Sequence, residues 1–307
     1  MTINLVIVGA TGIGKSQLAC QVALKINGEV INTDSRQVYK GMDIGTAKPT
    51  QDQMTLAKHH LYSVIDPMES FDLHLFQDLA ISAKLSIKGQ GKVPIFVGGT
   101  GQYIWSLVEG WKLTETNTDI YLRKELESQL KDEGLSSLVK ELKKRFPESL
   151  NGIDVRNPRR VVRALEKGIL GHAPVTIRPK NMSSLKDWFI VGLTTERPKL
   201  YKAVDCRLVD MIEAGWLSEV SQLADIGLTP DIPSMETIGY PEIYHFLQRK
   251  KDWSETVSSI KSRTHRLIRS QYNWFKLSDS RIDWYDVGEM DIDQITERVS
   301  GKIIRKV

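Results

Sequence analysis

The 307-residue chain has little cysteine and no long apolar segment. Cys20 and Cys206 are its only cysteines and form no C-x-x-C pair, so neither a disulfide framework nor a zinc module is indicated. No apolar run approaches the roughly 18 residues that a membrane-spanning helix needs. The N-terminus enters an apolar strand pattern directly, without a signal sequence. We therefore expect a cytoplasmic protein with no membrane partner, and because nothing indicates an obligate interface, a monomer.

Charge is nearly balanced overall but unevenly placed. The formal net charge is +4, yet seven lysines and arginines and a single acid, Glu166, lie between Arg156 and Lys180. Residues 283–297 are acidic instead. The local basicity of residues 156–180 is therefore the feature of the composition that has to be explained.

The segment GATGIGKS at residues 9–16 follows the apolar run Leu5–Val8 and leads into a helical pattern. Its G-x-x-x-x-G-K-[ST] spacing is typical of a phosphate-binding loop: glycines let backbone N–H groups converge on an anion, Lys15 adds a point charge, and the Ser16 hydroxyl can hold Mg²⁺. The N-terminal dipole of the helix adds to the attraction. We expect phosphate to be bound by Gly9, Ala10, Thr11, Gly12, Ile13, Gly14, Lys15 and Ser16, although the loop alone does not identify the ligand.

Short apolar strands alternate with helical patterns in the first hundred residues. Strands are expected at 5–8, 29–32 and 93–97. This order predicts an α/β fold, a P-loop NTPase-like parallel sheet covered by helices. In such sheets ligands bind at the carboxyl ends of the strands. The polar loops 9–16, 33–37 and 98–101 should therefore assemble one site.

From about residue 116 the pattern changes to charged amphipathic helices, expected at 121–126, 135–145 and 158–170. We predict an α-helical insertion domain at 116–185, and a catalytic core made of residues 1–115 and 186–307. A strand at 188–193 should rejoin the sheet. Three further helices are expected at 199–214, 218–223 and 255–276. The segment after Arg281 shows no pattern that predicts an element.

Asp34 follows the second predicted strand and has two interpretations, a turn or N-cap residue or a carboxylate that faces substrate. A nucleotide hydrolase or kinase usually ends a later strand in an Asp that helps to hold Mg²⁺. Here Gly98-Gly99-Thr100 follows instead. A hydroxyl among glycines suits a phosphate or bridging oxygen better than a metal, which favours phosphate as a leaving group on something other than a nucleoside triphosphate.

Three motifs, in order, resemble tRNA dimethylallyltransferases, the bacterial isopentenyltransferases that modify adenosine 37 of tRNA. They are residues 9–16, DSRQVYKGMDIGTAKP at 34–49, and VGGTGQY at 97–103. The similarity continues through HHL at 59–61, IDP at 65–67, RRVVRALE at 159–166, IGY at 238–240 and QYNWF at 271–275. It covers nearly the whole chain in the order of the family.

The resemblance implies that a dimethylallyl group moves from dimethylallyl diphosphate to the exocyclic N6 of adenosine 37 in the anticodon stem-loop, releasing pyrophosphate. It implies that Asp34 is the base and that Lys15, Ser16 with Mg²⁺, Thr100 and Arg207 hold the departing pyrophosphate. Without the resemblance, Arg207 would be interpreted as a solvated helix arginine.

The tRNA-contacting residues are likewise implied by the resemblance: Asp34, Ser35, Arg36, Gln37, Thr100, Arg123, Arg159, Arg160, Val161, Val162 and Arg163. From spacing alone, the helix around Arg159 gathers its cations on one face, which is either a solvated face or a surface for the tRNA backbone.

Several positions depart from the family pattern. Ala203 stands at a family arginine position, and Asn157 where an acid is usual. His265 follows Thr264, and is either a phosphate contact or a partly exposed helix histidine. Trp274 and Phe275 are expected to be core residues rather than platforms for stacking bases.

Three alternatives remain at this point: an adenylate isopentenyltransferase, a small-molecule P-loop kinase, and a nonenzymatic nucleotide-dependent RNA-binding module. The Gly98–Gly101 segment and the DIGTAKP motif at 43–49 are explained by neither the kinase nor the binding module. The long basic insertion favours tRNA over a free nucleotide as acceptor.

Overall fold

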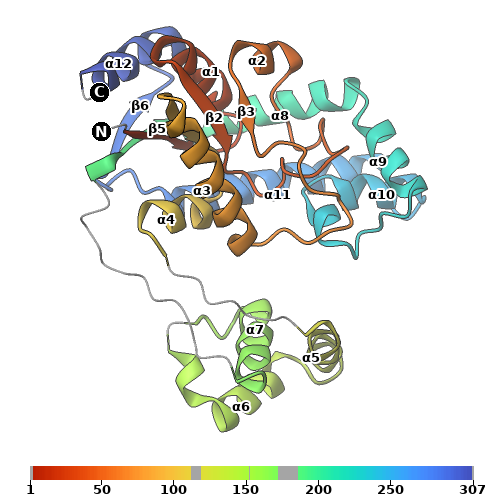
Figure 1. Ribbon diagram of the computed structural model, residues 1–307. Helices are drawn as coiled ribbons and strands as arrows, with labels where there is room; N and C mark the ends of the chain where they lie inside the picture. Colours follow the sequence, from red (N-terminus) through yellow and green to blue (C-terminus); the bar gives the residue numbers. More distant parts are fainter. Residues whose placement is uncertain (1–2, 112–118, 152, 172–185, 306–307) are drawn as a thin grey trace. The chain divides into compact units, whose positions relative to one another are not determined.

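The computed structural model describes residues 3–111, 119–151, 153–171 and 186–305, and the chain divides into two compact units (Figure 1). The core unit comprises residues 1–110 and 181–307, and the insertion unit residues 111–180. Among the described residues, no helix is both long and apolar enough to cross a membrane.

The core unit is built on a parallel six-stranded sheet, which confirms the predicted fold class. Its strand order is β3-β2-β4-β1-β5-β6. The strands are β1 (Asn4–Gly9), β2 (Gly28–Asn32), β3 (His59–His60), β4 (Val93–Val97), β5 (Trp188–Thr194) and β6 (Ile282–Asp286). Because β2, β4 and β1 are adjacent, the three loops that follow them emerge side by side at one edge of the sheet.

Helices cover both faces of the sheet. The helices of the core unit are α1 (Lys15–Ile26), α2 (Gln51–Leu56), α3 (Leu73–Gly89), α4 (Gly101–Val108), α8 (Arg197–Glu213), α9 (Trp216–Asp225), η3 (Pro233–Glu236), α10 (Tyr240–Leu247), α11 (Trp253–Trp274) and α12 (Ile292–Ile304). Leu18 of α1 and Val299 of α12 share one buried cluster with Ile95 and Val97 of β4. The neighbouring Phe96 points to the opposite face, where α3 packs on β4.

The C-terminal segment contains two elements that the sequence pattern did not predict. Strand β6 pairs with β5 at the edge of the sheet, and α12 packs on α1. The expectation that no element follows Arg281 was therefore wrong. A signal for α12 was present, because Asp291 and Gln294 form a capping box ahead of buried Ile295 and Val299.

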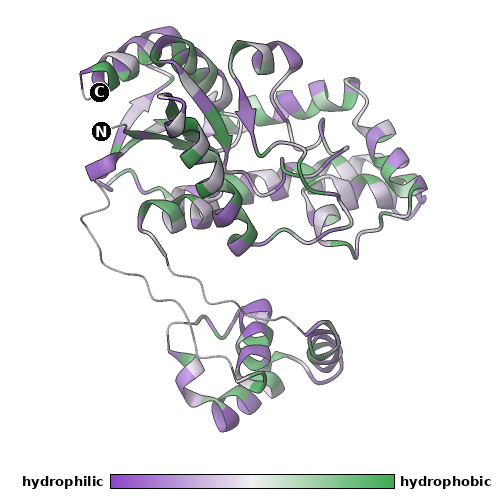
Figure 2. Ribbon diagram, viewed as in Figure 1, coloured by the Kyte–Doolittle hydropathy of each residue, from purple (hydrophilic) through white to green (hydrophobic). Residues whose placement is uncertain are grey.

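The described part of the insertion unit contains helices α5 (Ile120–Glu133), α6 (Leu135–Arg145), η1 (Pro147–Leu150) and α7 (Pro158–Ile169). The three helices predicted here are confirmed. Leu138, Leu142, Val161 and Leu165 form their common buried core. The helices carry hydrophilic and hydrophobic residues on different sides, as Figure 2 shows for both units.

The prediction for the aromatic pair at the end of α11 was half right. Phe275 is buried, but Trp274 is 38% exposed. The Trp274 ring covers Gly101, where an added Cβ would collide with it.

Candidate active site

The phosphate loop lies between β1 and the start of α1. Gly14, the N-cap of α1, has a φ of 97°, a left-handed conformation that glycine adopts without strain. Gly12 has a φ of 79°, and a Cβ there would approach the Val204 side chain of α8 to 2.5 Å. The loop is therefore shaped by backbone conformation and by close packing against α8, and it presents the N-terminus of α1 to the carboxyl edge.

Asp34 is held at the end of β2 by buried Asn32. The Asn32 side chain accepts a hydrogen bond from the Asp34 N–H at 2.8 Å and donates to the carbonyls of Asp34 and Leu61. One carboxylate oxygen of Asp34, Oδ1, accepts from the Arg36 N–H at 2.9 Å. The turn interpretation of Asp34 is thus confirmed, because Asp34 closes a turn through Oδ1. That its carboxylate faces a substrate stays a prediction.

Thr100 joins the second and third loops. It stands at the N-cap of α4, and its Oγ1 accepts from the Ser35 N–H at 3.2 Å. Since the hydroxyl acts as an acceptor in this contact, its own hydrogen is available for a ligand oxygen.

Lys15 carries the most perturbed charge of the site. Its Nζ donates to the Ala10 carbonyl at 2.8 Å. Burial lowers the pKa of Lys15 to about 8, the negative charge of Asp34 opposes this shift, and the positive charge of Arg207 adds to it. Lys15, Asp34 and Arg207 are therefore brought together, as predicted from three distant segments.

Arg207 lies on α8 and is partly buried. Burial lowers the pKa of its guanidinium. Within the described residues, neither an ion pair nor a hydrogen bond joins this guanidinium to another side chain. Ala203, one turn earlier on the same helix, is exposed. A desolvated guanidinium beside a desolvated ammonium is a strong binding site for an anion.

Arg36 and Gln37 lie in the same loop as Asp34 but make contacts within the protein. Arg36 donates to the Pro233 carbonyl at 2.9 Å, and Gln37 donates to the carbonyls of Thr46 and Ala47 at 3.0 Å. These contacts order the loop that leads from Asp34 into the DIGTAKP segment.

The DIGTAKP segment itself is held by a carboxylate of α9 and by its own lysine. The Glu219 carboxylate accepts from the N–H groups of residues 43–45, and Lys48 donates to the Tyr39 carbonyl and to Asp43. The structure thus gives this motif a scaffold role beside the site.

Tyr62 and Asn32 were missed by the sequence analysis. Burial and the nearby negative charge of Asp34 raise the pKa of the Tyr62 phenol well above its usual range, so it stays protonated beside that carboxylate. Its flanking residues Leu61 and Ser63 have left-handed φ angles of 65° and 51°. The sequence does hold one signal for Asn32, because this amide directly follows the apolar pair Val30 and Ile31 at the end of β2.

In the insertion unit, the predicted tRNA contacts divide into exposed and buried groups. Arg159, Arg160 and Arg163 are exposed on α7, whereas the Val161 and Val162 side chains are buried in the core of the unit. Asn157 caps α7 by accepting from the Arg160 N–H, which explains why a neutral residue serves at that position.

Arg123 has a structural partner of its own. Its guanidinium donates to buried Glu166 at 2.5 Å and 3.2 Å. Truncation of Arg123 would leave that carboxylate buried without its cation, so a loss of RNA binding in such a variant would be mixed with a loss of stability.

His265 is a partly exposed helix histidine, as the second interpretation predicts. Its Nε2 lies 3.0 Å from Asp205, and its ring stacks on Tyr201 with centroids 4.2 Å apart. His265 therefore ties α11 to α8, the helix that carries Arg207.

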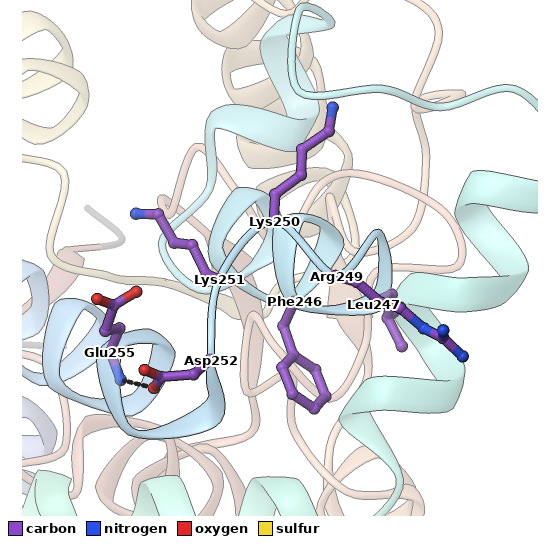
Figure 3. A pocket seen from close by; sticks show the side chains of 7 residues that line it. All are labelled: Phe246, Leu247, Arg249, Lys250, Lys251, Asp252 and Glu255. Atoms are coloured by element: carbon purple, nitrogen blue, oxygen red, sulfur yellow. Dashed lines mark hydrogen bonds between the residues drawn. The ribbon is translucent and has the colours of Figure 1, made fainter.

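An open hollow of about 650 Å³ lies at the turn between α10 and α11 (Figure 3). Arg249, Lys250 and Lys251 line it together with Phe246 and Glu255. None of the predicted site residues contributes to it, so it is separate from the site at the carboxyl edge.

Comparison with known proteins agrees with this geometry. The sequence profile of the IPP transferase family matches residues 37–278, and that of the isopentenyl transferase family matches residues 1–63. The tRNA dimethylallyltransferase of Dehalococcoides mccartyi is 39% identical over 289 residues, covering 93% of this chain and 88% of that protein. The chain belongs to the tRNA dimethylallyltransferase family. Members of this family are transferases that prenylate tRNA.

Solved structures of the family share the fold over the full length. A tRNA isopentenylpyrophosphate transferase from Bacillus halodurans superposes with a TM-score of 0.72 at 35% identity, covering 100% of this chain and 98% of that one. A eukaryotic dimethylallyltransferase acting on tRNA gives a TM-score of 0.75 at 28% identity, covering 99% of this chain and 78% of that one.

Because the Lys15 ammonium is desolvated, we expect its removal to stabilise the ligand-free protein and to weaken ligand binding. Lys15→Met should raise the free energy of unfolding of the ligand-free protein at pH 7 by about 1 to 3 kcal/mol, because the desolvation cost disappears. Below about pH 8 the amine is charged in both folded and unfolded states, so the full difference is present there. The difference should shrink as pH rises from about 8 towards 10.5, where the folded state has lost its ammonium.

Denaturant unfolding over this pH range measures the effect, with Lys25→Met in an exposed pair on the same helix as the control. The same Lys15 variant should lose the thermal stabilisation that pyrophosphate gives to the wild type. A ligand-free Lys15 variant that is less stable than wild type at pH 7 would contradict the interpretation.

Proposed function

We propose that this chain transfers the dimethylallyl group of dimethylallyl diphosphate to N6 of adenosine 37 in the anticodon loop of tRNA, with pyrophosphate as the leaving group. One observation carries the proposal: the Lys15 ammonium, desolvated by burial, lies within reach of the charges of Asp34 and Arg207, and the Arg207 guanidinium is itself partly desolvated. Paired cations suit a departing diphosphate, and the carboxylate suits a proton acceptor for the attacking amine.

In the proposed reaction, the N6 nitrogen of adenine forms a bond to C1 of the dimethylallyl group. The bond between C1 and the bridging oxygen breaks, and its electron pair leaves with the pyrophosphate. The proton of N6 goes to the Asp34 oxygen that does not accept from Arg36. Thr100 donates its hydroxyl hydrogen to a diphosphate oxygen, while Lys15 and Arg207 stabilise the charge that develops there.

Magnesium fits the proposed site in one specific way. Ser16 follows Lys15 in the first turn of α1 and offers a hydroxyl oxygen. Among the described residues no group of three or more His, Cys, Asp or Glu is suited to a metal, so Mg²⁺ would take its other ligands from diphosphate oxygens and water, as it usually does. When bound, the ion would neutralise negative charge on the leaving group.

The tRNA is proposed to be bound by the exposed arginines of α7. Arg159, Arg160 and Arg163 lie on the side of the helix opposite buried Val161 and Leu165. Arginines on such a face would neutralise backbone phosphates. The target base is stacked in its loop, and a single-stranded loop lowers the cost of extracting it into the core unit beside Asp34, Ser35 and Thr100. Because tRNA is the acceptor, we further infer a cytoplasmic protein, which we propose acts as a monomer.

The kinase alternative is weakened by the end of β4. Gly98-Gly99-Thr100 follows this strand at the site, and among the described residues Asp34 is the acid whose charge raises the pKa of Lys15. A nucleoside triphosphate site of the usual kind would place a second carboxylate there for Mg²⁺.

The role of Asp34 is tested by Asp34→Asn. The amide oxygen can still accept from the Arg36 N–H, so the turn is kept while the base is lost. Single-turnover transfer should slow by roughly 10² to 10⁴, the usual range for a positioned general base. Binding of dimethylallyl diphosphate should remain.

The matched control is Asp66→Asn. Asp66 Oδ1 accepts from the N–H two residues later at 2.9 Å, the same geometry as in Asp34, but outside the three loops of the site. This variant should transfer at the normal rate. Equal rates for the Asp34 variant and wild type at saturating substrates would remove Asp34 from the mechanism.

The role of α7 is tested by replacing Arg159, Arg160 and Arg163 together with alanine. Affinity for tRNA should fall, and the slope of log affinity against log salt should flatten by up to about three phosphate contacts. Binding of dimethylallyl diphosphate should not change, because its proposed ligands belong to the core unit.

The control removes three cations of the core unit, Arg298 and Lys302 of α12 and its C-cap Arg305, for the same change in net charge. If both triple variants weaken tRNA binding equally, the effect comes from overall charge and the assignment of α7 is wrong.

A further inference from the structure

We infer that Gln271 is a positioning residue of the diphosphate site, because one buried amide orients the peptide groups that hold Lys15 and Thr100. The inference rests on the proposed function of that site. Gln271 lies in the last turn of α11 and is 6% exposed. It opens the QYNWF motif, and neither the fold nor the proposed chemistry has yet assigned Gln271 a role.

The amide makes two hydrogen bonds to loops distant in sequence. Its Oε1 accepts from the Thr11 N–H at 2.9 Å, and its Nε2 donates to the Gly99 carbonyl at 3.3 Å. Reversing the amide would place a donor against the Thr11 N–H and an acceptor against the Gly99 carbonyl. The side chain therefore has one favourable orientation, which ties the loop after β1 to the loop after β4.

The first of these bonds reaches Lys15 through a single peptide group. The Thr11 N–H and the Ala10 carbonyl belong to the same planar unit, so an acceptor that fixes the N–H also fixes the direction of the carbonyl. That carbonyl accepts from Lys15 Nζ at 2.8 Å. Gln271 thus sets the position of the ammonium without touching it.

The second bond acts on Thr100 in the same manner. The Gly99 carbonyl shares a planar peptide with the N–H of Thr100, the residue whose Oγ1 accepts from Ser35. The orientation of this peptide sets where Thr100 enters α4. One amide therefore fixes two of the groups proposed to hold the leaving group.

The space for the amide is provided by Gly99. A Cβ at position 99 would collide with Gln271 Nε2, whereas the next nearest group, the Gly9 carbonyl, lies at 3.5 Å. Gly99 does not have a positive φ, so alanine is compatible with its backbone and the constraint is steric. The Gln271 amide can therefore occupy its position only because residue 99 has no side chain.

The test measures pyrophosphate binding to the full chain by calorimetry from pH 6 to 9. Gln271→Met keeps the approximate size and removes the amide. We expect its Kd for pyrophosphate to rise roughly 10- to 100-fold, the scale of loss from a displaced binding group. The pH at which binding weakens on the alkaline side should move down, because an ammonium without its carbonyl acceptor loses its proton more easily. Affinity for tRNA should not change.

Asn273→Ala is the matched control, since Asn273 is an exposed polar residue two positions away on the same helix. It should bind pyrophosphate as wild type does. If wild type itself fails to bind pyrophosphate, the proposed function is wrong. If wild type binds it and Gln271→Met matches wild type in both Kd and alkaline limit, the role of Gln271 is wrong.

A double-mutant cycle keeps the inference testable even if the methionine variant folds poorly. Gly99→Ala alone should weaken pyrophosphate binding, because its methyl displaces the amide. In a Gln271→Ala background the same methyl meets no amide, so it should add little further loss. Independent, additive losses from the two substitutions would overturn the inference.

Discussion

Two positive charges that lie close together and are partly buried are the constraint around which this site is organised. Lys15 and Arg207 repel each other, and burial lowers the pKa of both, while Asp34 is the acid that offsets the cost at Lys15. A ligand with a diphosphate group would supply the negative charge that these two cations lack. The two cations therefore lower the free energy of unfolding of the ligand-free protein. The same cations strongly attract the negative charge that develops on the leaving group in the reaction.

Neutral amides, and not further charges, hold these groups in place. Asn32 fixes Asp34, and Gln271 fixes the two peptides that lead to Lys15 and Thr100. Extra acids at these positions would neutralise the cations and compete with the ligand. An amide supplies one donor and one acceptor with no net charge, which orders the loops while the electrostatic attraction for an anion is kept.

Local spacing was sufficient to predict much of the fold. The phosphate loop, the strand at 188–193 and the helices of the insertion unit follow from patterns within a few residues. Strand β6 was missed because an edge strand with two aspartates among five residues has no continuous apolar run. The isolation of Arg207 and the bond from Gln271 to Thr11, 260 residues away, depend on tertiary packing that no local pattern contains. For Arg207, only the family resemblance pointed to the site.

The most direct test of the account follows both products of one turnover with dimethylallyl diphosphate and an unmodified anticodon stem-loop. We expect one pyrophosphate per N6-dimethylallyladenosine, with the modification confined to position 37, and almost no transfer to free AMP at the same concentration. Equal modification of AMP and of the stem-loop would support an adenylate isopentenyltransferase instead. Hydrolysis of ATP or release of inorganic phosphate, without prenyl transfer, would contradict the assignment of the two cations to a diphosphate leaving group.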